Sequence, residues 1–101
     1  MKYGIRFRPR AEADLIELYD YIAERSGANA AHGYVGRIRH ACMDLSTFPK
    51  RGTARDDIRK GLRVLRFERR VLIVFEVRKA IVVIARILYG GRDYERLLRS
   101  P

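Results

Sequence analysis

Residues 71–77 read Val-Leu-Ile-Val-Phe-Glu-Val, and residues 80–85 read Ala-Ile-Val-Val-Ile-Ala. Both stretches are short, rich in β-branched residues and almost continuously apolar, which predicts two strands. Only Arg78 and Lys79 separate them, and so tight a turn makes the strands antiparallel neighbours. An antiparallel strand with one face in water alternates apolar and polar residues, and these two do not. We therefore expect both faces of the sheet to be dry at its centre.

Two more strands accompany this pair, which we extend to residues 71–77 and 80–88. Residues 62–67 are β-branched and aromatic, and a three-residue link joins them to the strand that begins at Val71. Residues 2–8 alternate apolar side chains with polar residues or glycine, which predicts a strand with one face in water. Residues 50–60 are charged and lack periodicity, which predicts a basic loop.

Two helical patterns lie between the first strand and this loop. Apolar residues recur at helical spacing from Pro9 to Arg25 and again from Ala31 to Leu45. Ser26-Gly27 separates the two patterns, and Pro49 ends the second because the residue before a proline is disfavoured in helical geometry. Helices joined by so short a link pack as an antiparallel hairpin. The predicted inward positions are Leu15, Leu18, Ile22, Val35, Ile38, Cys42 and Leu45.

These elements predict one α+β domain over residues 1–101 with the order βααβββ. The helical hairpin packs on one face of a mostly antiparallel four-stranded sheet, and a short C-terminal tail or helix follows at residues 94–98. The predicted helical positions pack on Ile73, Phe75, Val83 and Ala85 or on their alternate-face neighbours. The hairpin covers one face only. If the tail leaves the other face open, that face is an apolar patch rimmed with arginine, which is typical of a protein-binding surface.

Charge is the main compositional signal. The chain has 101 residues with 22 basic and 12 acidic side chains, a net charge of +10, and most of the excess lies in residues 51–101. Eighteen of the basic residues are arginine, whose planar fork binds carboxylates and phosphates. The charge therefore predicts an acidic protein or nucleic-acid partner, with a merely solubilising surface as the alternative. No run is apolar enough to cross a membrane and no apolar leader opens the chain, so we expect a cytoplasmic protein.

Few residues carry chemistry of their own. Cys42 is the only cysteine and falls on an apolar helical stripe, and the two histidines, His32 and His40, are eight residues apart. We therefore expect no metal, no cofactor and no small-molecule substrate. A set of arginines and tyrosines remains, which either docks an acidic partner or positions RNA for cleavage, and docking is favoured. Its members are Arg59, Arg63, Arg66, Arg86, Arg92, Tyr89 and Tyr94.

Several segments together resemble the ParE branch of the ParE/RelE toxin superfamily. They are Phe-Arg-Pro-Arg-Ala-Glu-Ala-Asp-Leu (7–15) with Tyr-Ile-Ala (21–23), Leu-Ser-Thr-Phe-Pro (45–49) with Gly52, Gly-Leu-Arg (61–63), and Ile-Ala-Arg-Ile-Leu-Tyr-Gly-Gly-Arg-Asp (84–93). The resemblance extends over about residues 5–98. It implies the toxin of a type II toxin–antitoxin pair, in a hetero-oligomer with a ParD-like antitoxin whose C-terminal segment wraps the toxin.

The resemblance implies two possible mechanisms. RelE-like members cleave mRNA on the ribosome with lysine and arginine side chains and a C-terminal tyrosine. Here Arg92 falls near one of those arginines, but Leu98 stands at the tyrosine position and Phe67 replaces the central-strand arginine, with Arg66 one residue away. ParE-like members are DNA gyrase inhibitors without a hydrolytic site. We therefore predict a toxin that binds DNA gyrase or a gyrase–DNA complex, with ribosome-dependent mRNA cleavage as the alternative.

The predicted contact residues follow from this interpretation. The antitoxin is expected on the arginines Arg63, Arg66 and Arg86 and on the strand residues Val71, Ile73 and Phe75. The target is expected on the C-terminal residues Arg92, Asp93, Tyr94, Leu97 and Leu98. No catalytic residue is predicted for a binding toxin, whereas a nuclease would use Arg63, Arg66, Arg86 and Arg92.

Overall fold

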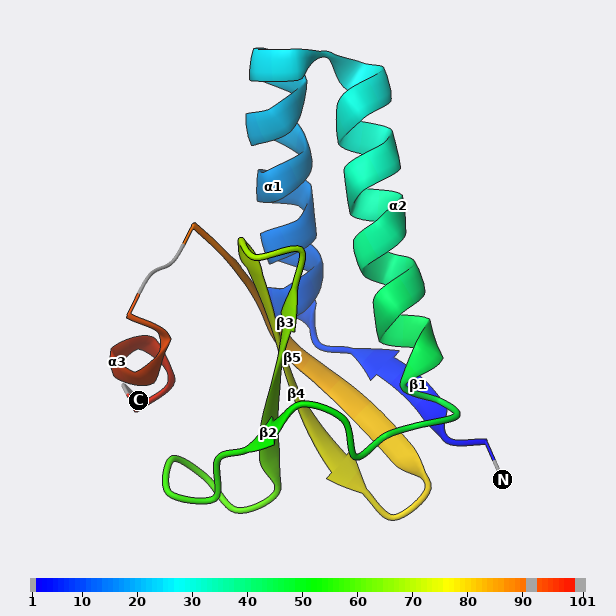
Figure 1. The fold of residues 1–101 in the computed structure, drawn as a ribbon, viewed down its shortest axis with the longest axis vertical. Helices are drawn as coiled ribbons and strands as arrows, with labels where there is room; N and C mark the ends of the chain where they lie inside the picture. Colours follow the sequence, from blue (N-terminus) through cyan, green and yellow to red (C-terminus); the bar gives the residue numbers. More distant parts are fainter. Residues whose placement is uncertain (1, 91–92, 100–101) are drawn as a thin grey trace.

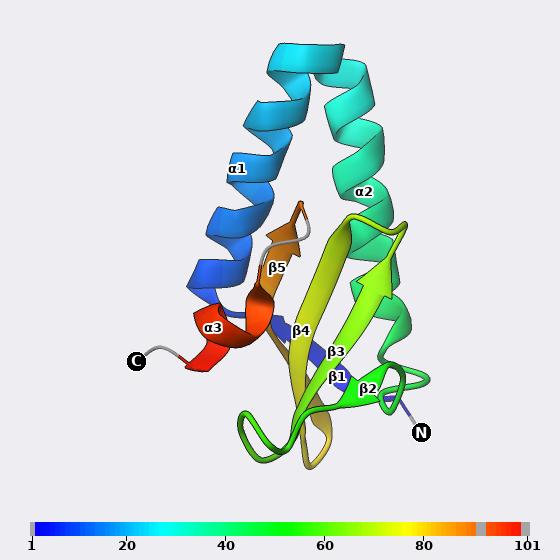
Figure 2. The ribbon, with the colours of Figure 1, turned by 60° about the vertical axis from the view of Figure 1, so that its left-hand side comes forward.

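The computed structural model describes residues 2–90 and 93–99. Along the chain the elements are β1 (Gly4–Phe7), α1 (Pro9–Ser26), α2 (Ala28–Asp44), β2 (Thr53–Ala54), β3 (Leu62–Phe67), β4 (Val71–Arg78), β5 (Ile81–Tyr89) and α3 (Tyr94–Arg99). Figures 1 and 2 show α1 and α2 as a hairpin on one side of the sheet and α3 on the other side. The predicted α+β fold, with its helical hairpin and short C-terminal helix, is confirmed.

The sheet has the strand order β1-β5-β4-β3-β2. β1 pairs with β5 in parallel, and the other pairs are antiparallel. The fifth strand is β2, which lies inside the predicted loop and pairs Thr53 with Val64 and Ala54 with Arg63. Two residues are too few to show an alternation in the sequence. Gly52 precedes β2 with φ 75°, and a Cβ there would lie 2.1 Å from the Val64 carbonyl oxygen, so the close approach to β3 requires glycine.

A bulge in β5 explains part of its unusual apolar pattern. The pairing shifts from Val74 with Arg86 to Phe75 with Ile84, which leaves Ala85 without a partner on β4. An extra residue reverses the faces of the side chains that follow it. Ile84 and Ile87 therefore both face the helices, although they are three residues apart.

The face under the hairpin, which we call the near face, carries the larger core. Thirteen buried residues form it: Ala11, Leu15, Leu18, Val35, Ile38, Cys42, Leu45, Val71, Ile73, Phe75, Val82, Ile84 and Ile87. The predicted helical phase is confirmed, and on β5 the alternate-face neighbours take the places of Val83 and Ala85. Val71, Ile73 and Phe75 are each 0% exposed. The helices cover these three predicted antitoxin contacts, which are therefore closed to a partner while the hairpin stays packed on the sheet.

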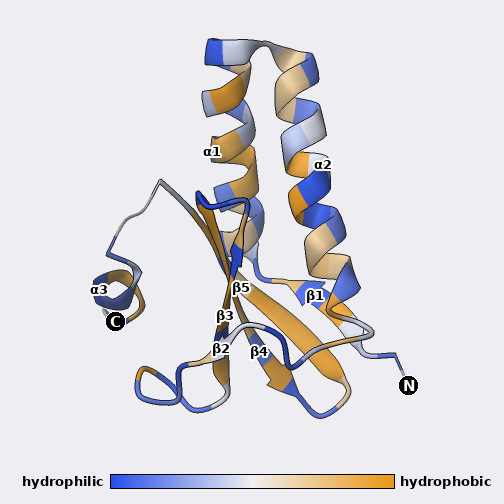
Figure 3. Ribbon diagram, in the orientation of Figure 1, coloured by the Kyte–Doolittle hydropathy of each residue, from blue (hydrophilic) through white to orange (hydrophobic). Residues whose placement is uncertain are grey.

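The opposite face, which we call the far face, is also dry. Its cluster consists of Leu62, Val64, Leu72, Val74, Ala85 and Leu88, none of them more than 7% exposed. Ile58 from the loop before β3 packs against it, as do Tyr94 and Leu98 from α3. Figure 3 shows hydrophobic colour along β4 and β5, whose two faces are both buried. The open apolar patch that the sequence allowed on this face is therefore closed by the chain itself.

Candidate functional site

Arg86 is held by a buried carboxylate on α1. Its Nε and Nη2 donate to Asp14 at 2.9 and 3.1 Å, and the Ile87 backbone N–H donates to the same carboxylate at 2.8 Å. Asp14 is 8% exposed. β1 pairs only with the first four residues of β5, so Asp14 satisfies the strand edge that β1 leaves open. Arg86 thus joins α1 to β5, so the guanidinium predicted to contact an antitoxin or a phosphate is already paired within the chain.

Arg63 is also engaged within the chain. Its Nε donates to the Arg51 carbonyl at 3.0 Å, and its Nη2 donates to the Lys50 and Gly52 carbonyls at 3.0 and 3.4 Å. This fork fixes the segment that leads into β2. Of the arginines predicted for binding or cleavage, Arg66 is exposed and donates only to the Arg69 carbonyl, at 3.3 Å. Arg92 lies outside the described residues.

A charged cluster fastens α3 to the loop before β3, and we call it the α3 latch. Arg55 donates to both oxygens of Asp57, at 2.9 and 2.8 Å, and to the Tyr94 hydroxyl at 2.5 Å. Its Nη2 lies 3.2 Å from Glu95, and Arg99 donates to Asp57 at 3.0 Å. The hydrogen bond from Arg55 lowers the pKa of Asp57 to about 2. Sequence reasoning missed this cluster because its members come from segments about 40 residues apart.

The residues predicted to bind the target differ in exposure, because α3 is fastened with one side against the sheet. Tyr94 and Leu98 pack inward on the far face, whereas Leu97 is 37% exposed. Asp93 accepts the Arg96 backbone N–H at 3.3 Å, which begins the helix. α3 therefore presents Leu97 on its outer surface, while two of the predicted contact residues serve as its anchors.

A cleft opens between the hairpin and the turn that joins β3 to β4. It is lined by Tyr34 and Arg37 of α2, Arg69 and Arg70 of the turn, and Tyr89 of β5. The Tyr34 and Tyr89 rings lie 6.3 Å apart in an edge-to-face arrangement. Burial raises the pKa of Tyr34, so its hydroxyl is neutral at physiological pH.

The turn beside this cleft has an unusual backbone. Glu68 and Arg69 adopt φ of 45° and 69°, a region that residues other than glycine seldom occupy. Arg37 donates to both oxygens of Glu68 at 2.9 and 3.1 Å, and the hydrogen bond lowers the pKa of Glu68. The arginine fork therefore holds the turn against α2.

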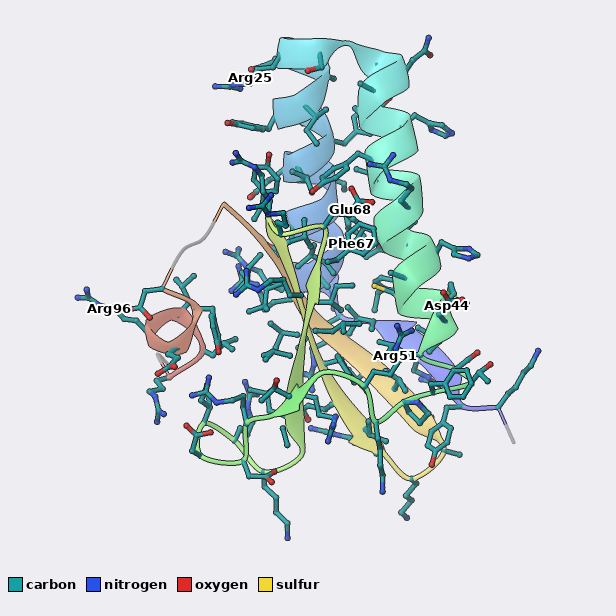
Figure 4. The ribbon with its side chains drawn as sticks, in the orientation of Figure 1. Arg25, Asp44, Arg51, Phe67, Glu68 and Arg96 are labelled. Atoms are coloured by element: carbon teal, nitrogen blue, oxygen red, sulfur yellow. The ribbon has the colours of Figure 1, made fainter. Side chains whose placement is uncertain are left out.

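A second hollow, the α2 groove, runs along the outer side of α2. Gly33, Gly36 and Ala41 line it together with Phe67, and polar side chains lie at its rim. Figure 4 shows Phe67 and Glu68 at the end of β3, beside α2. A Cβ at Gly36 would meet nothing within 4 Å, and one at Gly33 would meet only an Arg37 nitrogen at 3.9 Å. Glycine costs a helix about 1 kcal/mol relative to alanine, and the chain's own packing does not require it here.

Metal and thiol chemistry find little support in the described ranges, 2–90 and 93–99. No group of three or more His, Cys, Asp or Glu side chains there is placed to hold a metal ion. Cys42 is fully buried, and burial raises the pKa of its thiol to about 12. No helix in these ranges combines the length and the apolar character that crossing a bilayer needs.

The fold and these contacts define a small α+β domain. Arg63 and Arg86 support the fold from different strands, and the hollows on its surface are lined by mixed apolar and basic side chains. The family model described as "ParE toxin of type II toxin-antitoxin system, parDE" matches residues 5–94. The chain belongs to this family and is therefore a toxin of the type II class.

Relatives and solved structures agree with this assignment. The chain is 30% identical over 90 residues to Toxin ParE1 of Mycobacterium tuberculosis, covering 89% of this chain and 92% of the relative. It is 34% identical over 86 residues to Toxin ParE3 of Caulobacter vibrioides, covering 85% and 84%. A chain of the chromosomal ParDE system of P. aeruginosa superposes with TM-score 0.78 and 25% identity, covering 89% and 98%. A chain of the M. tuberculosis RelBE2 toxin–antitoxin complex, at 20% identity, shares the fold with TM-score 0.63, covering 89% of this chain and 100% of that chain.

Proposed function

We propose that this toxin acts in the cytoplasm, is neutralised by a ParD-like antitoxin, and inhibits DNA gyrase by binding the enzyme or its DNA complex. The observation that carries the binding mechanism is the engagement of Arg63 and Arg86. The Nε and Nη2 groups of both arginines donate to acceptors of the chain itself, at 3.4 Å or less, and neither residue is exposed. Arginines that stabilise a scissile phosphate need free donors directed at one point. These two are directed at a loop and at α1.

RNA cleavage through the 2′-hydroxyl also needs a proton acceptor. Both histidines belong to α2 and line the α2 groove with Phe67, which lies at the opposite end of β3 from Arg63. The Tyr94 hydroxyl accepts a hydrogen bond from Arg55 in the α3 latch. Each of these groups is thus separated from the arginines with which it would have to cooperate.

The α2 groove is the surface that we propose for the antitoxin. Gly33 and Gly36 leave the helix backbone open, because among the described residues a Cβ at Gly36 would meet nothing within 4 Å and one at Gly33 would meet only the Arg37 side chain. An amphipathic partner segment can lie close to this backbone and place an apolar side chain beside Phe67. The segment is acidic because the chain carries +10. Of the six predicted antitoxin contacts Arg66 is the one left exposed, and its partner Leu72 places it on the far face, so the segment has to pass around β3 to reach it.

The outer surface of α3 is the surface that we propose for the target. Leu97 is exposed there, and Asp93 and Arg92 come directly before the helix. Tyr94 and Leu98 contribute by holding the helix in place. The proposed target surface and the α2 groove lie on opposite sides of the sheet (Figure 2).

Toxin expression in a gyrase-dependent bacterium tests the mechanism. We expect DNA breaks and an SOS response, with intact mRNA, and relief of both effects by the cognate antitoxin. Codon-specific mRNA cuts on translating ribosomes with intact DNA would instead support a nuclease, above all if Arg92→Ala abolished them. Growth arrest that the cognate ParD-like protein fails to relieve would contradict the antitoxin pairing.

A pair of α2 variants tests the groove. Gly36→Leu fills it with a helix-favouring residue and is expected to weaken antitoxin binding at least tenfold while the free toxin stays folded. Met43→Leu also puts leucine on an exposed position of α2, but outside the groove, and should leave the affinity unchanged. Equal affinities of both variants, measured by calorimetry, would remove the groove from the interface.

A further inference from the structure

A buried acid lies at the end of the sheet that is remote from the tip of the hairpin. Glu76 of β4 is 2% exposed, and three arginines surround its carboxylate. Arg78 donates to Oε1 at 2.9 and 2.6 Å, whereas Arg59 and Arg8 approach Oε2 at 3.4 and 3.9 Å. Among the described residues, none donates a hydrogen bond to Oε2. One carboxylate therefore gathers three cations and leaves most of their N–H groups unused.

The arginines around Glu76 face water. The side chains of Arg8, Arg59 and Arg78 are 43%, 49% and 60% exposed. Two exposed lysines stand beside them in sequence, Lys60 in the loop before β3 and Lys79 in the β4–β5 turn. Figure 1 shows this loop and this turn at the same end of the molecule. We call the five basic residues the basic end.

Nearby acids compensate only part of this charge. Asp57 is taken up by Arg55 and Arg99 in the α3 latch, whereas Asp56 accepts the Gly61 backbone N–H at 2.8 Å and keeps its negative charge. Glu76 and Asp56 together offset two of the five cations. The basic end thus keeps a local excess of positive charge that is organised by a buried group, unlike scattered surface arginines.

The chemistry of the basic end selects among possible partners. The large exposed apolar side chains of the described residues lie on α1, α2, the segment after α2, and α3. A protein interface centres on apolar and aromatic side chains, and single-stranded nucleic acid is held by aromatic stacking. Residues 55–61 and 78–80 supply neither an aromatic ring nor an exposed large apolar group. Arginine and lysine without such groups are typical of contacts to the phosphates of a duplex.

We propose that the basic end binds the phosphodiester backbone of duplex DNA without sequence preference. Arg8, Arg59 and Arg78 contact phosphates with the N–H groups that Glu76 leaves free, and Lys60 and Lys79 extend the contact on both sides. Glu76 is a positioning residue, because it holds three guanidinium groups close together without neutralising them. This site does not depend on the choice of gyrase as target, since it is a property of the chain alone.

Fluorescence anisotropy of a labelled duplex with the purified full chain tests the proposal. If five phosphates are contacted, log Kobs against log salt should fall with a slope of about −4 to −5. Lys60→Gln/Lys79→Gln should make the slope shallower by about 2 and weaken binding about tenfold at low salt. Neither lysine touches Glu76 in the structure, so this variant keeps the fold.

The matched control is Arg69→Gln/Arg70→Gln in the β3–β4 turn. It removes the same charge at the opposite end of the sheet and should leave the slope within about half a unit of the wild-type value, against about one unit per lost phosphate contact. Arg59→Gln/Arg78→Gln should abolish binding, but it leaves Glu76 buried with little compensation, so its fold must be checked by circular dichroism. The lysine pair keeps the test valid if that variant unfolds.

Three results would overturn the proposal. Equal losses in the lysine pair and in the turn control would show an effect of net charge alone. Tighter binding of polyglutamate than of DNA would assign the surface to an acidic protein, and tighter binding of duplex RNA would assign it to RNA. Because no gyrase is present in this assay, its failure is distinguishable from a failure of the proposed target.

Discussion

The two faces of the sheet are equally dry but are held in different ways. On the near face, helices of 18 and 17 residues bury a core of thirteen side chains. On the far face, a six-residue helix and one loop side chain cover a cluster of six. The near face is held by apolar burial along two long helices. On the far face, α3 is held by two apolar anchors, Tyr94 and Leu98, and also by the charged side chains of the α3 latch.

This difference bears on which part of the toxin can move. A helix of six residues is unstable by itself, because nucleating its first turn costs more than its few hydrogen bonds return. α3 therefore depends on Tyr94, Leu98 and the latch. Local opening is expected at elements with few buried apolar contacts. The hairpin should open only with global unfolding, whereas α3 should open far below that free energy.

The largest expected effect is on the near face. Ile38 is 0% exposed at the centre of α2, and Ile38→Ala should lower the free energy of unfolding by about 4 kcal/mol, because it leaves a cavity under the hairpin. Urea denaturation measures the change. Met43→Ala, on the exposed side of the same helix, should change stability by less than about 0.5 kcal/mol. Similar losses for both variants would mean that the two sides of α2 are not as different as the structure shows.

The second largest effect is expected at the ion pair between Asp14 of α1 and Arg86 of β5. Asp14→Asn should cost about 3 kcal/mol, because it leaves the Arg86 guanidinium partly buried without its anion. The double variant Asp14→Asn/Arg86→Met should recover part of this loss, because no unpaired charge remains. If Asp14→Asn were as stable as the wild type, Arg86 would not depend on its contact with Asp14. Arg86 would then again be a candidate nuclease residue.

Most of the fold could be predicted from patterns in the sequence, but the candidate site could not. Particular residues show why. Leu18 and Ile38 are buried as predicted, because helical spacing specifies the inward face of a long helix. The continuous apolar run at residues 71–75 correctly predicted two dry faces, but it could not say what covers each. Both covers depend on contacts between distant segments.

The arginines show the same limit more clearly. Arg63, Arg66 and Arg86 look alike in the sequence, all three in or beside apolar strands. Only the tertiary structure reveals that Arg86 donates to Asp14 and that Arg63 donates to loop carbonyls. Asp14 is not among the inward positions that the periodicity of α1 predicted, and the bulge at Ala85 that accompanies the Arg86 contact leaves no mark in the pattern.

A smaller effect is expected at the cover of the far face. Leu98→Ala removes a half-buried anchor of α3 and should lower global stability by about 1 kcal/mol or less, while hydrogen exchange at Leu72 and Val74 speeds up. Leu97→Ala alters the neighbouring exposed side chain and should leave this exchange unchanged. If Leu98→Ala destabilised the protein as much as Ile38→Ala, the far face would be part of the main core, and the contrast between the faces would fail.

The smallest effect is a dependence of the α3 latch on pH. Asp57 has an ordinary pKa of about 3.9 in an unfolded chain. Arg55 lowers the pKa of Asp57 to about 2 in the folded state. A carboxyl whose pKa is lowered on folding stabilises the folded form above its unfolded value and loses this contribution as the pH falls through its folded value. The latch should therefore be intact above about pH 4 and weaken toward pH 2, as the proton displaces Arg55 and Arg99 from the carboxylate.

The Tyr94 ring resonances report the release of α3 in an NMR titration. Asp57→Asn has no such carboxyl to titrate and should show the weakened latch at every pH. A Tyr94 transition between pH 4 and 2 that persisted in Asp57→Asn would assign the acid sensitivity to other carboxyls and would leave α3 held by its apolar anchors alone.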